Sequence, residues 1–157
     1  MNVHLVRASV DDAQELHAMQ VEAFRELLDR YRDYDTSPGA ESLEKVKAKL
    51  SQGWTYFYFI EHEGVRVGAI RVVDAGSDDP ARAKRIAPLF ILPAYRKRGF
   101  GGSAVLAAEE IHGGENWFLD TILEEKGNCR LYEKLGYRKT GKATVINEKM
   151  TIIDYKK

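Results

Sequence analysis

The sequence contains a single cysteine, no long apolar run and no net charge. One cysteine excludes an internal disulfide, and there is no group of cysteines to hold a metal. This usage is typical of a reducing compartment, so we expect a cytoplasmic protein without a bound metal. The one thiol, Cys129, has no histidine near it in the sequence, and we expect a small buried residue there rather than a nucleophile.

No apolar run approaches the roughly 18 to 20 residues that a membrane-spanning helix needs, and residues 1–7 do not resemble a signal peptide. The 24 basic and 24 acidic residues balance, so the overall charge favours neither a nucleic-acid partner nor an anionic membrane. The length and the ordinary apolar content are typical of one globular domain. We therefore expect a single domain over residues 1–157, as a monomer or a homodimer.

Two hydrophobic periods alternate along the chain and predict an α+β fold. Apolar residues at helical spacing, with Gln20 the only polar member of their face, predict a first helix capped by Ser9 and Asp12. Aromatic and β-branched runs predict strands, with a hairpin turn at 61–64 and a turn-rich loop at 74–80. The strands are expected at 3–7, 54–60, 65–73, 85–92, 117–123, 137–142 and 145–154, and the later helices at 41–50, 101–112 and 128–135.

The segment from Pro88 to Leu106 is the most informative part of the chain. A short apolar strand ends at Pro93, and a basic, glycine-rich loop leads into a helical pattern that begins near Gly101. Glycines allow a tight turn in which successive N–H groups converge, and a helix start adds unpaired N–H groups and the positive end of a dipole. The segment therefore predicts an anion-binding loop for a phosphate or pyrophosphate.

Three motifs compete for this loop. The Walker phosphate loop is excluded, because the sequence has no Gly-x-x-x-x-Gly-Lys-Ser/Thr. A dinucleotide fingerprint fits loosely as Gly99-x-Gly101-x-x-Ala104, with Asp120 at a suitable distance for a ribose contact. Six residues separate the strand from Gly99, however, where that fingerprint turns directly off its strand, and repeated βαβ units are missing.

The third motif includes the arginine, as Arg96-x-x-Gly99-x-Gly101. Together with the preceding Leu89-Phe-Ile-Leu-Pro-Ala-Tyr, it resembles the coenzyme A pyrophosphate loop of the GNAT superfamily of acyl-coenzyme A N-acyltransferases. Asn128-Cys-Arg-Leu-Tyr-Glu-Lys-Leu-Gly-Tyr resembles the second signature of that family. The resemblance is strongest from 86 to 138 and weak before residue 54. It implies a mixed, mostly antiparallel central sheet flanked by helices, with the elements in the order found above.

The resemblance also implies an activity, the transfer of an acetyl group from acetyl-coenzyme A to a primary amine of a small molecule or peptide, by direct attack in a ternary complex. It places the acid that protonates the departing thiolate at Tyr132, although this side chain could instead only pack under Tyr137. A backbone N–H near Ile91 or Leu92 would stabilise the oxyanion. Coenzyme contacts are implied at Ile91, Leu92, Arg96, Lys97, Arg98, Gly99, Phe100, Gly101, Gly102, Ser103 and Asn128, the last of which would also cap its helix.

The general base is where the sequence departs from the family. Many relatives have a glutamate early on the strand before the loop, but residues 83–87 read Ala-Lys-Arg-Ile-Ala. Two alternatives stay open. One is a general base from another part of the chain, with Glu22, Glu26, Glu61 and Asp120 as candidates, and the other is catalysis without a general base. The missing carboxylate also leaves a second function open, a non-catalytic acyl-coenzyme A sensor or interaction module.

Three further expectations concern side chains outside the two motifs. Lys84 and Arg85 suggest an acceptor that carries a carboxylate or phosphate. The four histidines show no paired ligand spacing, so we expect surface or solvated residues at His4, His17, His62 and His112. Tyr31, Tyr34 and Trp54 could line an acceptor pocket, but filling the core is the default expectation for aromatic residues.

Overall fold

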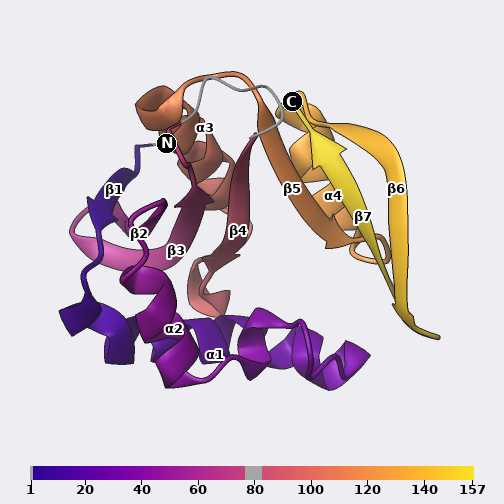
Figure 1. The fold of residues 1–157 in the computed structure, drawn as a ribbon, viewed down its shortest axis with the longest axis horizontal. Coiled ribbons are helices and arrows are strands. Elements are labelled where there is room, and N and C mark those ends of the chain that lie inside the picture. The colour runs from indigo at the N-terminus through magenta and orange to yellow at the C-terminus, as the bar shows by residue number, and fades with distance from the viewer. Residues whose placement is uncertain (1, 77–82) are drawn as a thin grey trace.

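The computed structural model describes residues 2–76 and 83–157. Seven strands form one sheet in the order β1-β2-β3-β4-β5-β7-β6, and every pairing between the described strands is antiparallel except that of β4 with β5 (Figure 1). The predicted mixed sheet flanked by helices is confirmed. The strands are β1 His4–Arg7, β2 Thr55–His62, β3 Val65–Val73, β4 Lys84–Ile91, β5 Trp117–Ile122, β6 Arg138–Asn147 and β7 Met150–Lys156, and the helices are α1 Ala13–Tyr31, α2 Leu43–Leu50, α3 Phe100–His112 and α4 Lys126–Lys134.

The sheet has an apolar core on each face, because side chains alternate along every strand. In β2, Tyr58 and Ile60 belong to the core beneath α3 and α4, whereas Phe57 and Phe59 belong to the core beneath α1 and α2. The run of aromatic residues in β2 is thus explained, since a strand covered on both faces needs apolar side chains at successive positions.

Helix α1 is fixed by the features that the sequence singled out. Asp12 accepts the backbone N–H of Ser9 at 2.9 Å, and this predicted capping pair encloses the short 3-10 turn Val10–Asp12 that leads into α1. Gln20 is fully buried, and its Nε2 donates to the carbonyl of Pro38 at 2.8 Å and to Glu41 at 2.7 Å. The polar member of the apolar face therefore ties the α1–α2 connection to the helix.

Strands β4 and β5 part soon after they meet. Their parallel pairing comprises only Lys84 with Trp117 and Arg85 with Phe118, whereas β4 continues alongside β3 as far as Ile91. Figure 1 shows the two strands splaying apart below this point. The edge of β4 that faces β5 is consequently free of a strand partner over the described residues that follow Arg85.

Several boundaries and two aromatic residues differ from the sequence-based expectations. The last hairpin turns at 148–149 rather than at 143–144, because β6 continues through Asn147. Tyr34 and Trp54 are 64% and 53% exposed, so the expectation that they fill the core was wrong, while Tyr31 is buried. Residues 77–80 of the predicted turn-rich loop lie outside the described residues.

Candidate functional site

The predicted anion-binding loop lies between the end of β4 and the start of α3. Lys97 and Gly99 both have left-handed backbones, with φ of 62° and 82°, and Gly99 immediately precedes the helix. Ser103 donates the first bond of the helix, to the carbonyl of Gly99 at 3.1 Å. The amides of residues 100–102 come before that bond and are directed out of the helix start, as an anion site requires. We call residues 96–103 the anion loop.

Arg96 fastens the anion loop to the rest of the molecule. Its Nε donates to the carbonyl of Ile91 at 3.0 Å, and its Nη2 donates to the carbonyl of Ala23 in α1 at 2.5 Å. Lys97 and Arg98 are exposed, and Arg98 lies 5.1 Å from the ring of the buried Phe100. The arginine of the motif thus shapes the loop, and the next two cations remain at the surface.

The backbone of β4 distinguishes the two amides considered for the oxyanion. The N–H of Leu92 donates to the carbonyl of Val67 in β3 at 2.8 Å. In an antiparallel ladder, pairs that exchange hydrogen bonds alternate with pairs that do not. Ile91 is opposite Gly68, the next pair along, and therefore belongs to a pair without hydrogen bonds. The N–H of Ile91 is therefore directed to the opposite edge of β4, toward the gap that opens before β5.

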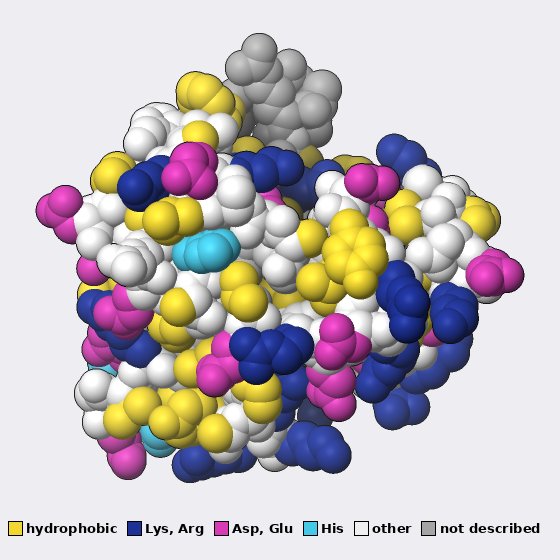
Figure 2. Space-filling view, turned by 90° about the horizontal axis from the view of Figure 1, so that it is seen from below, with side chains coloured by type: hydrophobic (Ala, Val, Ile, Leu, Met, Phe, Trp, Pro, Cys, Tyr) yellow, Lys and Arg dark blue, Asp and Glu magenta, His cyan; other side chains and the backbone are white. Residues whose placement is uncertain are grey.

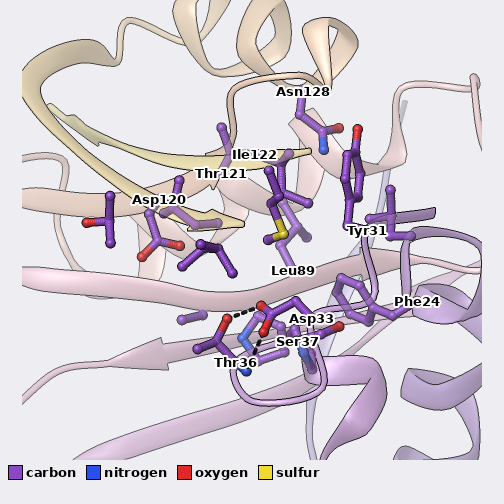
Figure 3. A pocket seen from close by; sticks show the side chains of 18 of the residues that line it. Phe24, Tyr31, Asp33, Thr36, Ser37, Leu89, Asp120, Thr121, Ile122 and Asn128 are labelled. Carbon is purple, nitrogen blue, oxygen red and sulfur yellow. Dashed lines mark hydrogen bonds between the residues drawn. The ribbon is translucent and has the colours of Figure 1, made fainter. Parts of the chain in front are cut away.

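A cavity of about 450 Å³ lies where β4 and β5 diverge (Figure 3). Its wall combines α1, the loop 33–38, β4, β5, the start of α4 and the β6–β7 hairpin. The lining is largely apolar, with three carboxylates and two cations as its charged groups. It comprises Phe24, Leu27, Leu28, Tyr31, Asp33, Thr36, Ser37, Pro38, Arg85, Ile86, Ala87, Pro88, Leu89, Asp120, Thr121, Ile122, Asn128, Tyr132, Lys142, Thr144, Ile146, Met150, Ile152 and Asp154.

Tyr132 and Asn128 reach this cavity from α4. Tyr132 is buried, its ring centroid lies 6.2 Å from that of Tyr137, and burial raises the pKa of its hydroxyl far above the ordinary value. Tyr132 thus both packs beside Tyr137 and lines the cavity. Asn128 is not the helix cap that the sequence suggested, because α4 begins at Lys126 after Glu125.

Of the four carboxylates considered as bases, Asp120 lines the cavity. Its Oδ2 accepts Arg85 Nη2 at 2.5 Å, and burial, reinforced by the charge of Asp154, raises its pKa. The other three candidates lie elsewhere in the described chain: Glu22 and Glu26 are exposed, and Glu61 is paired with Arg66 at 3.4 Å.

The two cations of β4 do not form an anion site in the cavity. Lys84 Nζ donates to the carbonyl of His112 at 3.0 Å and lies over the ring of Trp117 at 5.1 Å, while Arg85 is paired with Asp120. Both side chains are therefore engaged by other groups, and they no longer support the expectation of an acceptor that carries a carboxylate or phosphate.

The expectation that His112 is a surface or solvated residue was wrong. Its side chain is only 6% exposed, and its ring forms hydrogen bonds with Asp74 and with the hydroxyl of Tyr58. Cys129 is buried, as expected.

Part of the cavity wall was not indicated by the sequence. Asp33 is buried in the loop after α1 and accepts the backbone N–H groups of Asp35 and Thr36 at 3.2 and 3.0 Å. Asp154 and Lys142 come from the last hairpin. No spacing along the chain links these residues, and the alternation of β5 and β7 would have indicated Asp154 only if their register were known.

Among the described residues, no group of histidine, cysteine or acidic side chains could hold a metal ion, and no helix is long and apolar enough to cross a membrane.

Comparison with known proteins agrees with this geometry. Residues 11–137 match the model of the acetyltransferase (GNAT) family. No curated protein matches the sequence significantly. Among solved structures, an acetyltransferase from Thermus thermophilus is 15% identical with a TM-score of 0.68, covering 99% of this chain and 96% of that one.

Two other similar structures contain ligands. The PaiA N-acetyltransferase from Thermoplasma acidophilum, in complex with coenzyme A, is 16% identical with a TM-score of 0.66 over the whole of both chains. Spermidine N-acetyltransferase from Vibrio cholerae, in complex with coenzyme A and spermine, is 13% identical with a TM-score of 0.73, covering 98% and 93%. At these identities the structures establish the fold alone, and the family model, which spans most of the sequence, shows that the chain belongs to the GNAT family of acetyltransferases.

Proposed function

We propose that this protein transfers the acetyl group of acetyl-coenzyme A to a primary amine of a small molecule or peptide, by direct attack in a ternary complex. The observation that carries the proposal is a set of three features on and beside β4: its strand edge, free beyond Arg85, the cavity lined by Tyr132, and the anion loop that follows the strand. We assign the reaction to a single domain over residues 1–157, in the cytoplasm.

The donor side is suited to an acyl-coenzyme A. The outward amides at the start of α3 and the exposed Lys97 and Arg98 supply donors and positive charge for a pyrophosphate. A Cβ added to Gly101 would lie 3.7 Å from Leu131 of α4 and 3.9 Å from Ile91 of β4. The loop therefore adjoins both elements that border the cavity, and the coenzyme A bound to the similar Thermoplasma acidophilum protein supports the same ligand here.

The chemistry is assigned to one amide and one hydroxyl. The N–H of Ile91 would stabilise the oxyanion that forms when the amine attacks the thioester, because it is directed into the gap. Tyr132 would donate to the departing thiolate. Its raised pKa keeps the hydroxyl protonated but disfavours full transfer to a thiolate with a pKa of about 8.5, so its position is the larger contribution.

The alternative is an acyl-coenzyme A-binding module without turnover, which the absence of a carboxylate from β4 favours. A thiol-release assay with acetyl-coenzyme A and a panel of primary amines distinguishes the two. Spermine belongs in the panel because the similar Vibrio cholerae enzyme binds it. We expect amine-dependent release of coenzyme A, whereas binding of acetyl-coenzyme A without release for any amine would favour the module.

A further inference from the structure

Two carboxylates lie side by side in the cavity on neighbouring strands. Asp120 of β5 is directly opposite Asp154 of β7 in the antiparallel ladder. The alternation of both strands places the pair on one face, while Leu119 and Tyr155 belong to the core on the other. Figure 3 shows Asp120 on the cavity wall. We call these two residues the carboxylate pair.

The pair is unfavourable by itself, because like charges directly opposite one another destabilise an antiparallel sheet. The cations beside it lie further out. The side chains of Asp154 and Asp120 are 20% and 35% exposed, whereas those of Arg85 and Lys142 are 48% and 73% exposed. Figure 2 shows lysine and arginine side chains gathered on the outer surface at the β6–β7 end. Both carboxylates are therefore less exposed than the cations that pair with them.

We infer that Asp120, backed by Asp154, is the general base that takes the proton from the acceptor amine, replacing the carboxylate that β4 lacks. The inference rests on the proposed acetyl transfer. It makes the acceptor a primary amine that enters as its ammonium ion, bound by the carboxylate pair, with an apolar stem against Leu89, Ile122 and Met150. A carboxylate on the acceptor is disfavoured by the same two charges.

The protons and electrons balance as follows. One ammonium proton moves to the Asp120 carboxylate, and the freed lone pair forms a C–N bond to the thioester carbonyl, whose π electrons become the oxyanion. When the carbonyl re-forms, the C–S bond breaks and its electrons leave on sulfur. The nitrogen loses a second proton, the thiolate gains one from Tyr132, and the phenolate is reprotonated by that second proton. Asp120 finally releases its proton to solvent.

The surroundings of Asp120 suit it to this role. Burial and Asp154 raise its pKa, and the cations Arg85 of β4 and Lys142 of β6 lower it. Tyr31 of α1, Asp33 of the loop after α1 and Tyr132 of α4 are the other titratable groups that line the same cavity. A carboxylate with a raised pKa accepts a proton more readily near neutral pH, provided that it is ionised when the acceptor binds.

The test uses three amines that each have a six-carbon chain: n-hexylamine, 1,6-diaminohexane and 6-aminohexanoate. We expect wild-type protein to acetylate the first two at least tenfold better than 6-aminohexanoate. Asp120→Asn should lower kcat/KM by about 10²- to 10⁴-fold, with unchanged affinity for acetyl-coenzyme A by calorimetry. The matched control is Asp11→Asn, which alters an exposed carboxylate far along the chain and should leave the rate unchanged.

A second measurement reports on the pair without turnover. The carboxyl ¹³C resonance of Asp120, assigned by its loss in Asp120→Asn, should titrate above the ordinary aspartate range. Asp154→Asn should move that midpoint, and the acid limb of kcat/KM, to lower pH, because it removes a negative neighbour. Arg85→Gln should move both to higher pH, because it removes a positive one.

The outcomes separate the inference from the function on which it rests. If folded Asp120→Asn keeps more than a third of the wild-type kcat/KM, or if Asp154→Asn leaves the Asp120 midpoint unmoved, the assignment of the base is wrong. If wild-type protein prefers 6-aminohexanoate, or binds acetyl-coenzyme A but acetylates none of the three amines, the acceptor class is wrong. Failure to bind acetyl-coenzyme A would overturn the proposed function instead.

Discussion

The anion loop and the cavity are built in different ways. The loop consists of eight consecutive residues and relies on backbone amides and a glycine, whereas the cavity takes its wall from six separate parts of the chain. Two of the three cations of the loop, Lys97 and Arg98, are exposed, while the carboxylate pair is partly buried. A candidate site made of contiguous backbone can thus be identified from a motif, and one made of distant side chains cannot.

The two regions should therefore respond to different substitutions, with changes in the cavity affecting turnover and changes in the loop affecting affinity. After that of Asp120→Asn, the largest effect is expected for Tyr132→Phe, which removes the hydroxyl and keeps the buried ring. It should lower kcat about ten- to a thousandfold and leave the affinity for acetyl-coenzyme A nearly unchanged, as measured by thiol release and calorimetry. Tyr34→Phe, at an exposed tyrosine, is the control. An unchanged kcat in Tyr132→Phe would remove this residue from the mechanism.

A smaller effect, on the affinity for acetyl-coenzyme A rather than on turnover, is expected for Gly99→Ala. The added Cβ meets no atom within 4 Å, but a φ of 82° costs a non-glycine residue about 1–2 kcal/mol. If this strain disturbs the loop, acetyl-coenzyme A should bind about tenfold more weakly, with kcat at saturation little changed. Gly114→Ala also adds a Cβ into open space and serves as the control. Equal affinities for the two variants would show that the backbone of Gly99 does not shape the donor site.

The smallest effect on ligand binding is expected for Arg96→Met, which removes the bonds to Ile91 and Ala23 but retains an unbranched side chain. Charged hydrogen bonds of a partly exposed residue should contribute about 1–2 kcal/mol to the free energy of unfolding. Tm should then fall by about 2–8 °C, and affinity for acetyl-coenzyme A by a few-fold. Arg25→Met, at an exposed position in α1, is the comparison. A large loss of affinity with unchanged Tm would instead mean that Arg96 contacts the ligand.

The sequence predicted the order of elements and the position of the anion loop, because local periodicity and one contiguous motif determine them. The mostly antiparallel sheet was implied by the resemblance to the GNAT family. The sequence also indicated Tyr132, through the second motif. It left Asp120 as one of four candidate bases and did not indicate Asp154, because their proximity depends on the register of β5 and β7. The expectation from Lys84 and Arg85 failed for a similar reason, since successive residues of a strand face opposite sides of the sheet.

The most direct test of the account is a calorimetric titration of the purified protein with acetyl-coenzyme A, with NAD as the control ligand. It needs no knowledge of the acceptor and addresses the one ligand that the anion loop, the cavity and the proposed chemistry all require. We expect micromolar binding of acetyl-coenzyme A and no binding of NAD. Binding of NAD, or of neither ligand, would contradict it.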